Sequence, residues 1–181
     1  STTIINGIIP IADSKAKSGL IDQLQPQAAN GYTDVLKAFT EAQATLKGAN
    51  LASHKTIVIF LTDGKPEVQN PSSSYEDDTL KIVGQLGVPV YAIALTSSSQ
   101  TAFLNLVASE TGGKVIPAHT ANDLLNSYLQ ILSDLKDRTI MGEGSQRSPG
   151  ELTLPLDPTL MPYVSKVTFI VSKDPAVTVH L

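Results

Sequence analysis

Apolar residues follow two different patterns along the first 135 positions of the chain. Residues 57–61 and 88–95 are nearly continuous apolar runs, which are typical of strands covered on both faces in the middle of a parallel sheet. The segments around these runs instead repeat apolar residues at the 3.6-residue spacing of amphipathic helices. This alternation predicts an α/β fold, a doubly wound, mostly parallel sheet with helices on both faces.

Capping and turn residues place the individual elements. A capping-box spacing opens a predicted helix at residues 73–76, and a glycine pair at 112–113 ends the helix that residues 97–99 cap. Thr120 caps a last helix, whose inward face is expected to hold Leu124, Tyr128, Ile131 and Leu135. The other predicted elements are helices at 14–24 and 34–47 and strands at 3–12, 56–62, 88–95 and 114–117.

The pattern changes after residue 137. Residues 138–150 are predicted to be a linker, most of it rich in glycine and serine. Apolar and polar residues then alternate in three short segments between 152 and 181, with no helical pattern between them. We therefore predict an α/β domain over residues 1–137 and the start of a β-rich, sandwich-like domain over residues 151–181.

Composition narrows the classes of partner. The formal net charge is -4, and no basic stripe surrounds the two arginines, Arg138 and Arg147, which argues against a nucleic-acid partner. No apolar run is long enough to span a membrane, so no membrane insertion of this segment is expected. The absence of cysteine excludes disulfides, thiolate metal sites and cysteine nucleophiles.

Two oxygen-rich loops carry the candidate chemistry. Asp63 directly follows the apolar strand at 56–62, and a carboxylate placed there projects into the crevice where open α/β sheets bind ligands. Thr33 precedes the helix at 34–47, which leads straight to that strand. The ordinary role of such a threonine is to cap the helix, a contribution of ~1 kcal/mol. The ordinary role of Asp63 would be to shape the turn before Gly64, but its position at the end of a buried strand favours a ligand-binding role.

These loops belong to a series of landmarks that resembles the von Willebrand factor type A domain family. The landmarks occur in the family's order and spacing: Gly-Tyr-Thr-Asp at 31–34, Ile-Phe-Leu-Thr-Asp-Gly at 59–64, Val-Tyr-Ala-Ile-Ala-Leu at 90–95, Leu-Asn-Leu-Val-Ala at 104–108 and Thr-Gly-Gly at 111–113. Thr-Asp-Gly alone is a common turn, so the resemblance depends on the whole series, which runs over roughly residues 1–137. It implies a Rossmann-like fold.

The resemblance also implies a metal site. In this family a metal-ion-dependent adhesion site (MIDAS) holds Mg²⁺ or Mn²⁺, and Ca²⁺ is a further possibility, at the top of the sheet. Thr33 and Asp63 match two of its three ligand-bearing loops. Mg²⁺ prefers oxygen ligands in octahedral geometry and retains waters, which fits a hydroxyl and a carboxylate. An open coordination position then accepts an acidic residue of a partner protein, so the implied function is recognition rather than catalysis.

The family's third loop, Asp-Xaa-Ser-Xaa-Ser after the first strand, does not occur in these 181 residues. Residues 1–11 resemble the end of the second strand running into an antiparallel edge strand. A sheet made from this chain alone would therefore have a gap two strands wide, with about a dozen unpaired backbone groups at ~1–3 kcal/mol each if buried. We expect a larger protein, in which the N-terminal segment that carries the missing strands is itself a partner of this chain.

Three functions stay open from the sequence. The leading hypothesis is a metal-dependent adhesion module of an extracellular or cell-surface protein. The second is a structural scaffold of the same fold, whose metal site is incomplete and whose partners bind without metal. The third is a phosphotransferase of the haloacid dehalogenase type, which also places an aspartate after a buried strand. That family needs Asp-Xaa-Asp, and Leu61 stands where the first aspartate should be.

The remaining polar residues have structural interpretations. Asp34 is expected to interact with the helix dipole or to lie behind the metal ligands rather than bind metal itself. The acidic run at 76–78 is expected to be a solvated helix start, although it could border the binding face. The three histidines have no zinc-like spacing and are expected at the surface: His54, His119 and His180.

Overall fold

The computed structural model describes residues 8–11, 13–26, 33–49, 51–63, 66–68, 70–97 and 101–136. The chain divides into two compact units, Ser1–Lys136 and Asp137–Leu181, and all described residues belong to the first. The linker and the β-rich segment predicted from the sequence lie outside the described residues.

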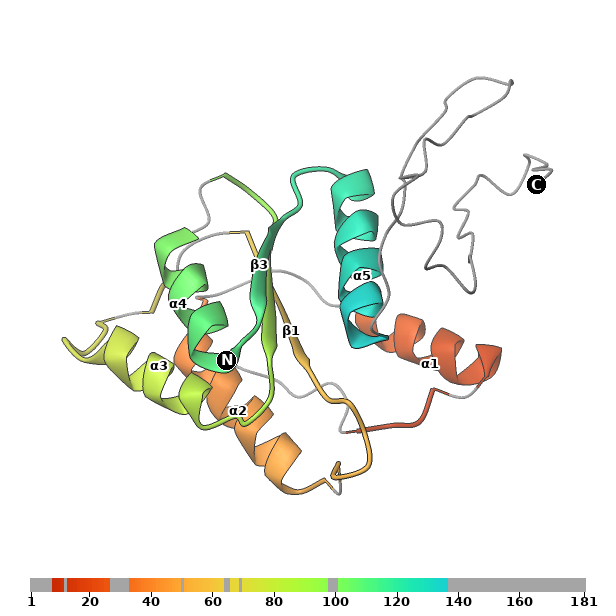
Figure 1. Ribbon diagram of the computed structural model, residues 1–181, viewed down its shortest axis with the longest axis horizontal. Helices are drawn as coiled ribbons and strands as arrows, with labels where there is room; N and C mark the ends of the chain where they lie inside the picture. Colours follow the sequence, from red (N-terminus) through yellow and green to blue (C-terminus); the bar gives the residue numbers. More distant parts are fainter. Residues whose placement is uncertain are drawn as a thin grey trace, which may run out of the picture. The chain divides into compact units, whose positions relative to one another are not determined.

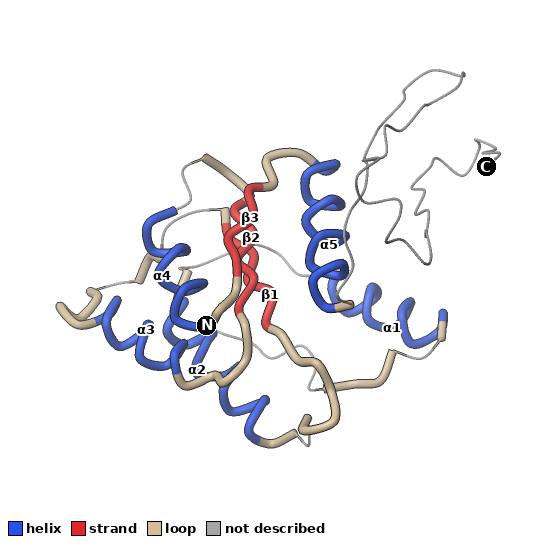
Figure 2. Tube along the Cα trace, in the orientation of Figure 1, coloured by secondary structure: helices blue, strands red, loops and turns tan. Residues whose placement is uncertain are grey.

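The described residues form five helices and three strands, and helices and strands alternate from α2 onward (Figure 1). The elements are α1 Ser14–Leu24, α2 Val35–Lys47, β1 Val58–Thr62, α3 Tyr75–Gly84, β2 Val90–Ala94, α4 Thr101–Thr111, β3 Lys114–Pro117 and α5 Ala121–Leu135. The strands are parallel and lie side by side in the order β1-β2-β3 (Figure 2). The predicted α/β fold with a parallel sheet is therefore confirmed, and α1 and β3 begin and end at the predicted residues.

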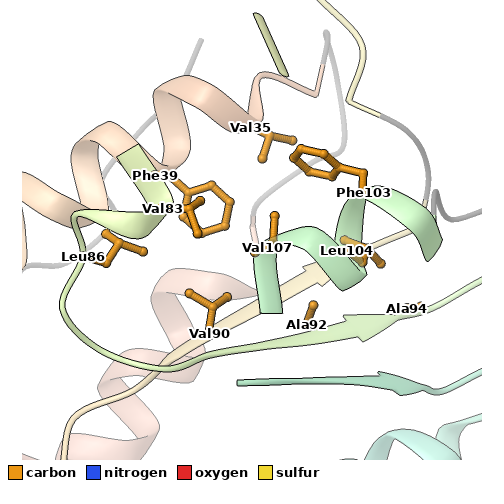
Figure 3. Packing of buried hydrophobic residues seen from close by; sticks show 10 residues of the cluster. All are labelled: Val35, Phe39, Val83, Leu86, Val90, Ala92, Ala94, Phe103, Leu104 and Val107. Carbon is orange, nitrogen blue, oxygen red and sulfur yellow. The ribbon is translucent and has the colours of Figure 1, made fainter. Parts of the chain in front are cut away.

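One face of the sheet is covered by α2, α3 and α4. Their apolar side chains meet those of β2 in a single core (Figure 3). Val83 of α3 and Val107 of α4 are fully buried, and the ring of Phe39 on α2 lies 5.2 Å from that of Phe60 on β1, between centroids. The 3.6-residue spacing that predicted these helices therefore corresponds to their buried faces.

The other face of the sheet is covered by α5, which packs on β2 and β3. Ile131 is buried there as predicted, but Tyr128 is 42% exposed, so its predicted inward position is wrong. Ser127 takes that place in the core instead. Its hydroxyl donates a 2.8 Å hydrogen bond to the carbonyl of Asp123 within the helix, which removes the cost of burying a polar group.

Strand β1 lies at an edge of the described sheet, where the gap left by the missing strands is expected from the sequence. Every residue of β2 is buried, whereas most of β1 is half-buried and Leu61 is 38% exposed. The reason is that α5 covers β2 and β3 rather than β1, and no described strand lies along the outer edge of β1.

The strand predicted at 3–12 is not found where it can be checked. Residues 8–11 form no strand, and the rest of the prediction falls on residues that the structure does not describe. A strand needs a neighbour for its backbone groups, and residues 8–11 pair with no described strand. Pro10 in addition has no N–H to donate to a ladder.

Helix caps were predicted with mixed success. Thr120 caps α5 as predicted, and Asp123 completes a capping box by accepting a 2.9 Å hydrogen bond from the Thr120 N–H. The capping box predicted at residues 73–76 is wrong. The N-cap Ser74 makes no side-chain bond to the helix backbone, because its hydroxyl donates instead to the Asp78 carboxylate at 2.8 Å.

Candidate functional site

The two predicted metal ligands both lie at the carboxyl edge of the sheet. Asp63 follows the last residue of β1, and Thr33 precedes α2 by two residues; both are exposed. The N–H of Glu67, beyond β1, donates a 3.0 Å hydrogen bond to the carbonyl of Thr33. The segment after β1 is thus tied to the segment before α2, and the structure brings together the two loops that the sequence singled out.

A second tie fixes the Asp63 loop to the neighbouring strand. The hydroxyl of Thr96, just after β2, donates a hydrogen bond to the carbonyl of Asp63. The N–H of Leu95 likewise donates to the carbonyl of Thr62 at 2.9 Å, which extends the β1-β2 ladder by one step. The backbone of Asp63 is therefore held in place, while its side chain is exposed to solvent.

The ordinary capping role expected for Thr33 belongs to Asp34. Asp34 is the N-cap of α2, and its Oδ1 accepts a 3.1 Å hydrogen bond from the N–H of Lys37. A carboxylate at this position also interacts favourably with the helix dipole, as predicted for Asp34. Since the helix does not need the Thr33 hydroxyl, that oxygen is available for a ligand.

Tyr75 joins the beginning of α3 to the beginning of α2. Its hydroxyl donates to Asp34 Oδ1 at 3.1 Å and accepts from the N–H of Leu36 at 3.1 Å. Burial raises the pKa of the Tyr75 phenol, and the adjacent Asp34 carboxylate raises it further, although the Leu36 N–H acts in the opposite direction. Sequence reasoning missed this residue, because no local pattern signals a contact between positions 41 apart in the chain.

The chemistry of the two side chains suits a hard cation. Neither the Thr33 hydroxyl nor the Asp63 carboxylate hydrogen-bonds or pairs with another residue in the described part of the chain. Both present oxygen atoms, which Mg²⁺ prefers, and Mg²⁺ commonly keeps several waters beside one or two protein ligands. The described residues contain no group of three or more His, Cys, Asp or Glu side chains able to hold a metal. An ion held by Thr33 and Asp63 would therefore need further donors from elsewhere.

The remaining polar residues agree with their structural interpretations where they are described. The acidic run 76–78 lies in the first turn of α3, exposed to solvent. His54 and His119 are exposed, and Nδ1 of His54 lies 3.1 Å from the hydroxyl of Ser53. His180 falls outside the described residues.

The sequence was also compared with known proteins. The family model of the von Willebrand factor type A domain matches residues 5–130 of the chain. No curated protein matches the sequence. Among the described residues, no helix has the length and apolar character needed to cross a membrane.

Proposed function

The chain belongs to the von Willebrand factor type A domain family, and we propose that it is a metal-dependent protein-binding module. Domains of this family commonly mediate protein interactions and adhesion, often occur in extracellular proteins and are generally not enzymes. In our proposal Thr33 and Asp63 hold Mg²⁺, and an acidic residue of a partner protein takes an open position on the ion. The parent protein is secreted or exposed on a cell surface.

One observation carries the proposal. Two exposed oxygen-bearing side chains come from loops that hydrogen bonds fix at the carboxyl edge of the sheet, and neither side chain has a structural task among the described residues. Asp34 caps α2 in place of Thr33. An oxygen that the fold leaves unused at a ligand-binding edge is better explained by a ligand than by stability.

The bound ion would act by electrostatic attraction. Mg²⁺ would supply concentrated positive charge that attracts the carboxylate of the partner. Asp63 would neutralise part of that charge, and the neutral Thr33 hydroxyl would leave the ion electrophilic enough to bind a further anion. The fixed backbone of both loops would keep the two oxygens in place, so that little conformational entropy is lost when the partner binds.

The outer edge of β1 offers a place for the third loop. The N–H of Val58 donates to Pro89 and the carbonyl of Thr62 accepts from Leu95, so alternate residues of β1 face β2. The backbone groups of Ile59 and Leu61 therefore face the opposite edge. A parallel strand placed there would end beside Asp63, and its following loop would supply the remaining oxygens. We propose that another segment of the same protein provides this strand.

Mn²⁺ binding tests the proposal. Calorimetric titration of the intact protein with Mn²⁺ should show binding that Asp63→Ala weakens by at least about tenfold, since a lost charged ligand costs more than ~1.4 kcal/mol. Asp22→Ala is the matched control, because it removes an exposed carboxylate from α1. Equal Mn²⁺ affinity in the Asp63→Ala and Asp22→Ala proteins would remove Asp63 from the site.

The runner-up is a structural scaffold that binds partners without metal. It is favoured because, in the part of the chain that the structure describes, there is no group of three or more His, Cys, Asp or Glu side chains able to hold a metal. Partner binding that is indifferent to EDTA, in a protein that also shows no Mn²⁺ titration, would select this alternative.

A further inference from the structure

A cavity of about 510 Å³ opens beside the candidate metal site. Three segments line it: the stretch that follows the Asp63 loop, the beginning of α3 and the first turn of α4. The lining residues are Pro66, Glu67, Val68, Pro71, Ser72, Ser73, Tyr75, Glu76 and Phe103. Its size falls within the range of pockets that hold small ligands or single side chains of a partner, ~300–1,000 Å³.

The cavity is physically connected to the candidate metal site. Glu67 is one of the lining residues, and its N–H donates a 3.0 Å hydrogen bond to the carbonyl of Thr33. Tyr75 lines it from the opposite segment and bonds to Asp34, the residue after Thr33. A protein segment that reaches a metal at Thr33 and Asp63 therefore passes within reach of this cavity.

The apolar part of the lining is rigid. Phe103 is only 2% exposed, and it is packed in the main core with α2 and α3. The Tyr75 phenol is held by two hydrogen bonds, to Asp34 and from Leu36, which fixes its ring at the wall of the cavity. Pro66 and Pro71 add stiff backbone. A rigid apolar lining can bind the stem or the plane of a side chain with little loss of entropy.

The charged side chains among the described lining residues are both acidic. Glu67 and Glu76 are both exposed, and neither forms an ion pair with a described residue. Asp77 and Asp78 follow Glu76 in the first turn of α3. The helix dipole contributes only about half a positive charge at that end, so three carboxylates outweigh it and leave the rim negative. Such a lining is complementary to a cation.

We propose that this cavity binds a cationic side chain, arginine by preference over lysine, of the protein partner. A guanidinium is planar, stacks on aromatic rings and donates hydrogen bonds to carboxylates in two directions, which suits a lining with one tyrosine and two glutamates. That the cation and the metal-bound carboxylate belong to the same partner rests on the proposed function. Binding of the cation itself does not depend on the metal.

The test uses the intact protein and a matched pair of probes. Nα-acetyl-arginine methylamide and its neutral isostere, Nα-acetyl-citrulline methylamide, are titrated without metal into ¹⁵N-labelled protein. We expect the arginine probe to shift the amide signals of Glu67, Val68, Tyr75 and Glu76. Saturation is expected on the order of 1–10 mM, because a ligand of this size gains little free energy per atom. The citrulline probe should leave these signals in place.

The variants remove charge without changing shape. The double variant Glu67→Gln, Glu76→Gln should weaken binding of the arginine probe at least fivefold. The control Glu41→Gln, Glu110→Gln removes the same charge from α2 and α4 and should change it less than twofold. Equal shifts with both probes, or no shifts at the cavity, would overturn the proposal. Binding of Mn²⁺ without binding of the arginine probe would overturn this inference alone. Binding of the arginine probe without binding of Mn²⁺ would overturn only the proposed metal site.

Discussion

The phenol of Tyr75 donates a hydrogen bond to Asp34 Oδ1 across 3.1 Å, between the first residue of α3 and the N-cap of α2. The same hydroxyl accepts from the N–H of Leu36, and Asp34 Oδ1 also accepts from the N–H of Lys37. Four groups thus share one small network beside Thr33. Its effect is to hold the start of α2, and with it the candidate ligand loop, against the start of α3.

Removing the Tyr75 hydroxyl should loosen this junction. Tyr75→Phe keeps the ring but deprives the Leu36 N–H of an acceptor and Asp34 of a donor. We expect a loss of about 1 kcal/mol in the free energy of unfolding, since the network is half-buried and water can replace part of it. Urea denaturation followed by circular dichroism measures the change. Tyr128→Phe is the control, because Tyr128 is exposed and should alter stability by less than about 0.5 kcal/mol. Equal effects of the two substitutions would deny the network any energetic role.

The division of labour between Thr33 and Asp34 gives a second prediction. Thr33→Val removes the hydroxyl at constant shape and should leave the stability of the protein within about 0.5 kcal/mol, because α2 is capped by Asp34. The same substitution should weaken Mn²⁺ binding severalfold. Asp34→Ala should instead lower the free energy of unfolding by about 1 kcal/mol or more, because the cap of α2 is lost. Unfolding curves and Mn²⁺ titrations of both variants separate the two roles. A destabilised Thr33→Val protein would assign the capping function to Thr33 after all.

Prediction from the sequence succeeded where the signal was local. The 3.6-residue spacing in α2 and the Thr120 cap of α5 depend on residues within a few positions of one another, and the structure confirms both. The apolar run of β1 was also recognised as a strand. Its lower burial was not predicted, because a run of Val, Ile, Phe and Leu does not say which elements cover the strand.

The same distinction applies to the site. Thr33 and Asp63 were identified as candidate ligands through the family resemblance, and their places before a helix and after a strand fix the edge of the sheet they occupy. The Tyr75 network and the cavity depend on contacts between α2, α3 and α4, which no spacing in the sequence encodes. Ser127 was missed for a related reason: a serine that bonds within its own helix can occupy a core position that hydrophobicity assigns to Tyr128.

Alkaline pH should destabilise the protein. The Asp134 carboxylate accepts from the Lys114 ammonium at 2.7 Å, which raises the pKa of Lys114, and it accepts from the Tyr91 hydroxyl at 3.3 Å. The pKa of Tyr91 is raised by burial first and by Asp134 second, and that of Tyr75 is raised by burial. Each group keeps its proton to a higher pH in the folded chain than in the unfolded chain. The stability they provide is complete below the unfolded pKa and falls as pH rises beyond about 10.

Urea unfolding at about pH 8 and about pH 10.5 measures this loss, a window set by the ordinary pKa values of tyrosine and lysine. In the double variant Tyr75→Phe, Tyr91→Phe the protein should be less stable at the lower pH, yet its stability should fall less between the two pH values. The single variant Tyr128→Phe should keep the slope of the parent. An unchanged slope in the double variant would show that these phenols do not cause the alkaline loss.

Gly113 supplies the last prediction. It follows Gly112, whose φ of +69° confirms the predicted left-handed end of α4, and its N–H donates to the carbonyl of Ala108 at 2.9 Å. A Cβ on Gly113 would overlap the backbone carbonyl of Val90, in the central strand of the sheet. Because this obstacle is backbone rather than a flexible side chain, Gly113→Ala must displace β2 from β3, and we expect a loss of about 3 kcal/mol or more.

Gly19→Ala is the matched control for Gly113→Ala. Gly19 lies within α1, and nothing stands within 4 Å of where its Cβ would be. Alanine there should stabilise the protein by up to about 1 kcal/mol, because it favours the helix and restricts the unfolded chain. Thermal and urea unfolding of the two variants should therefore move in opposite directions. If Gly113→Ala were tolerated as well as Gly19→Ala, the close approach of the α4–β3 turn to β2 would be wrong, and with it the β2-β3 register that places Tyr91 beside Lys114.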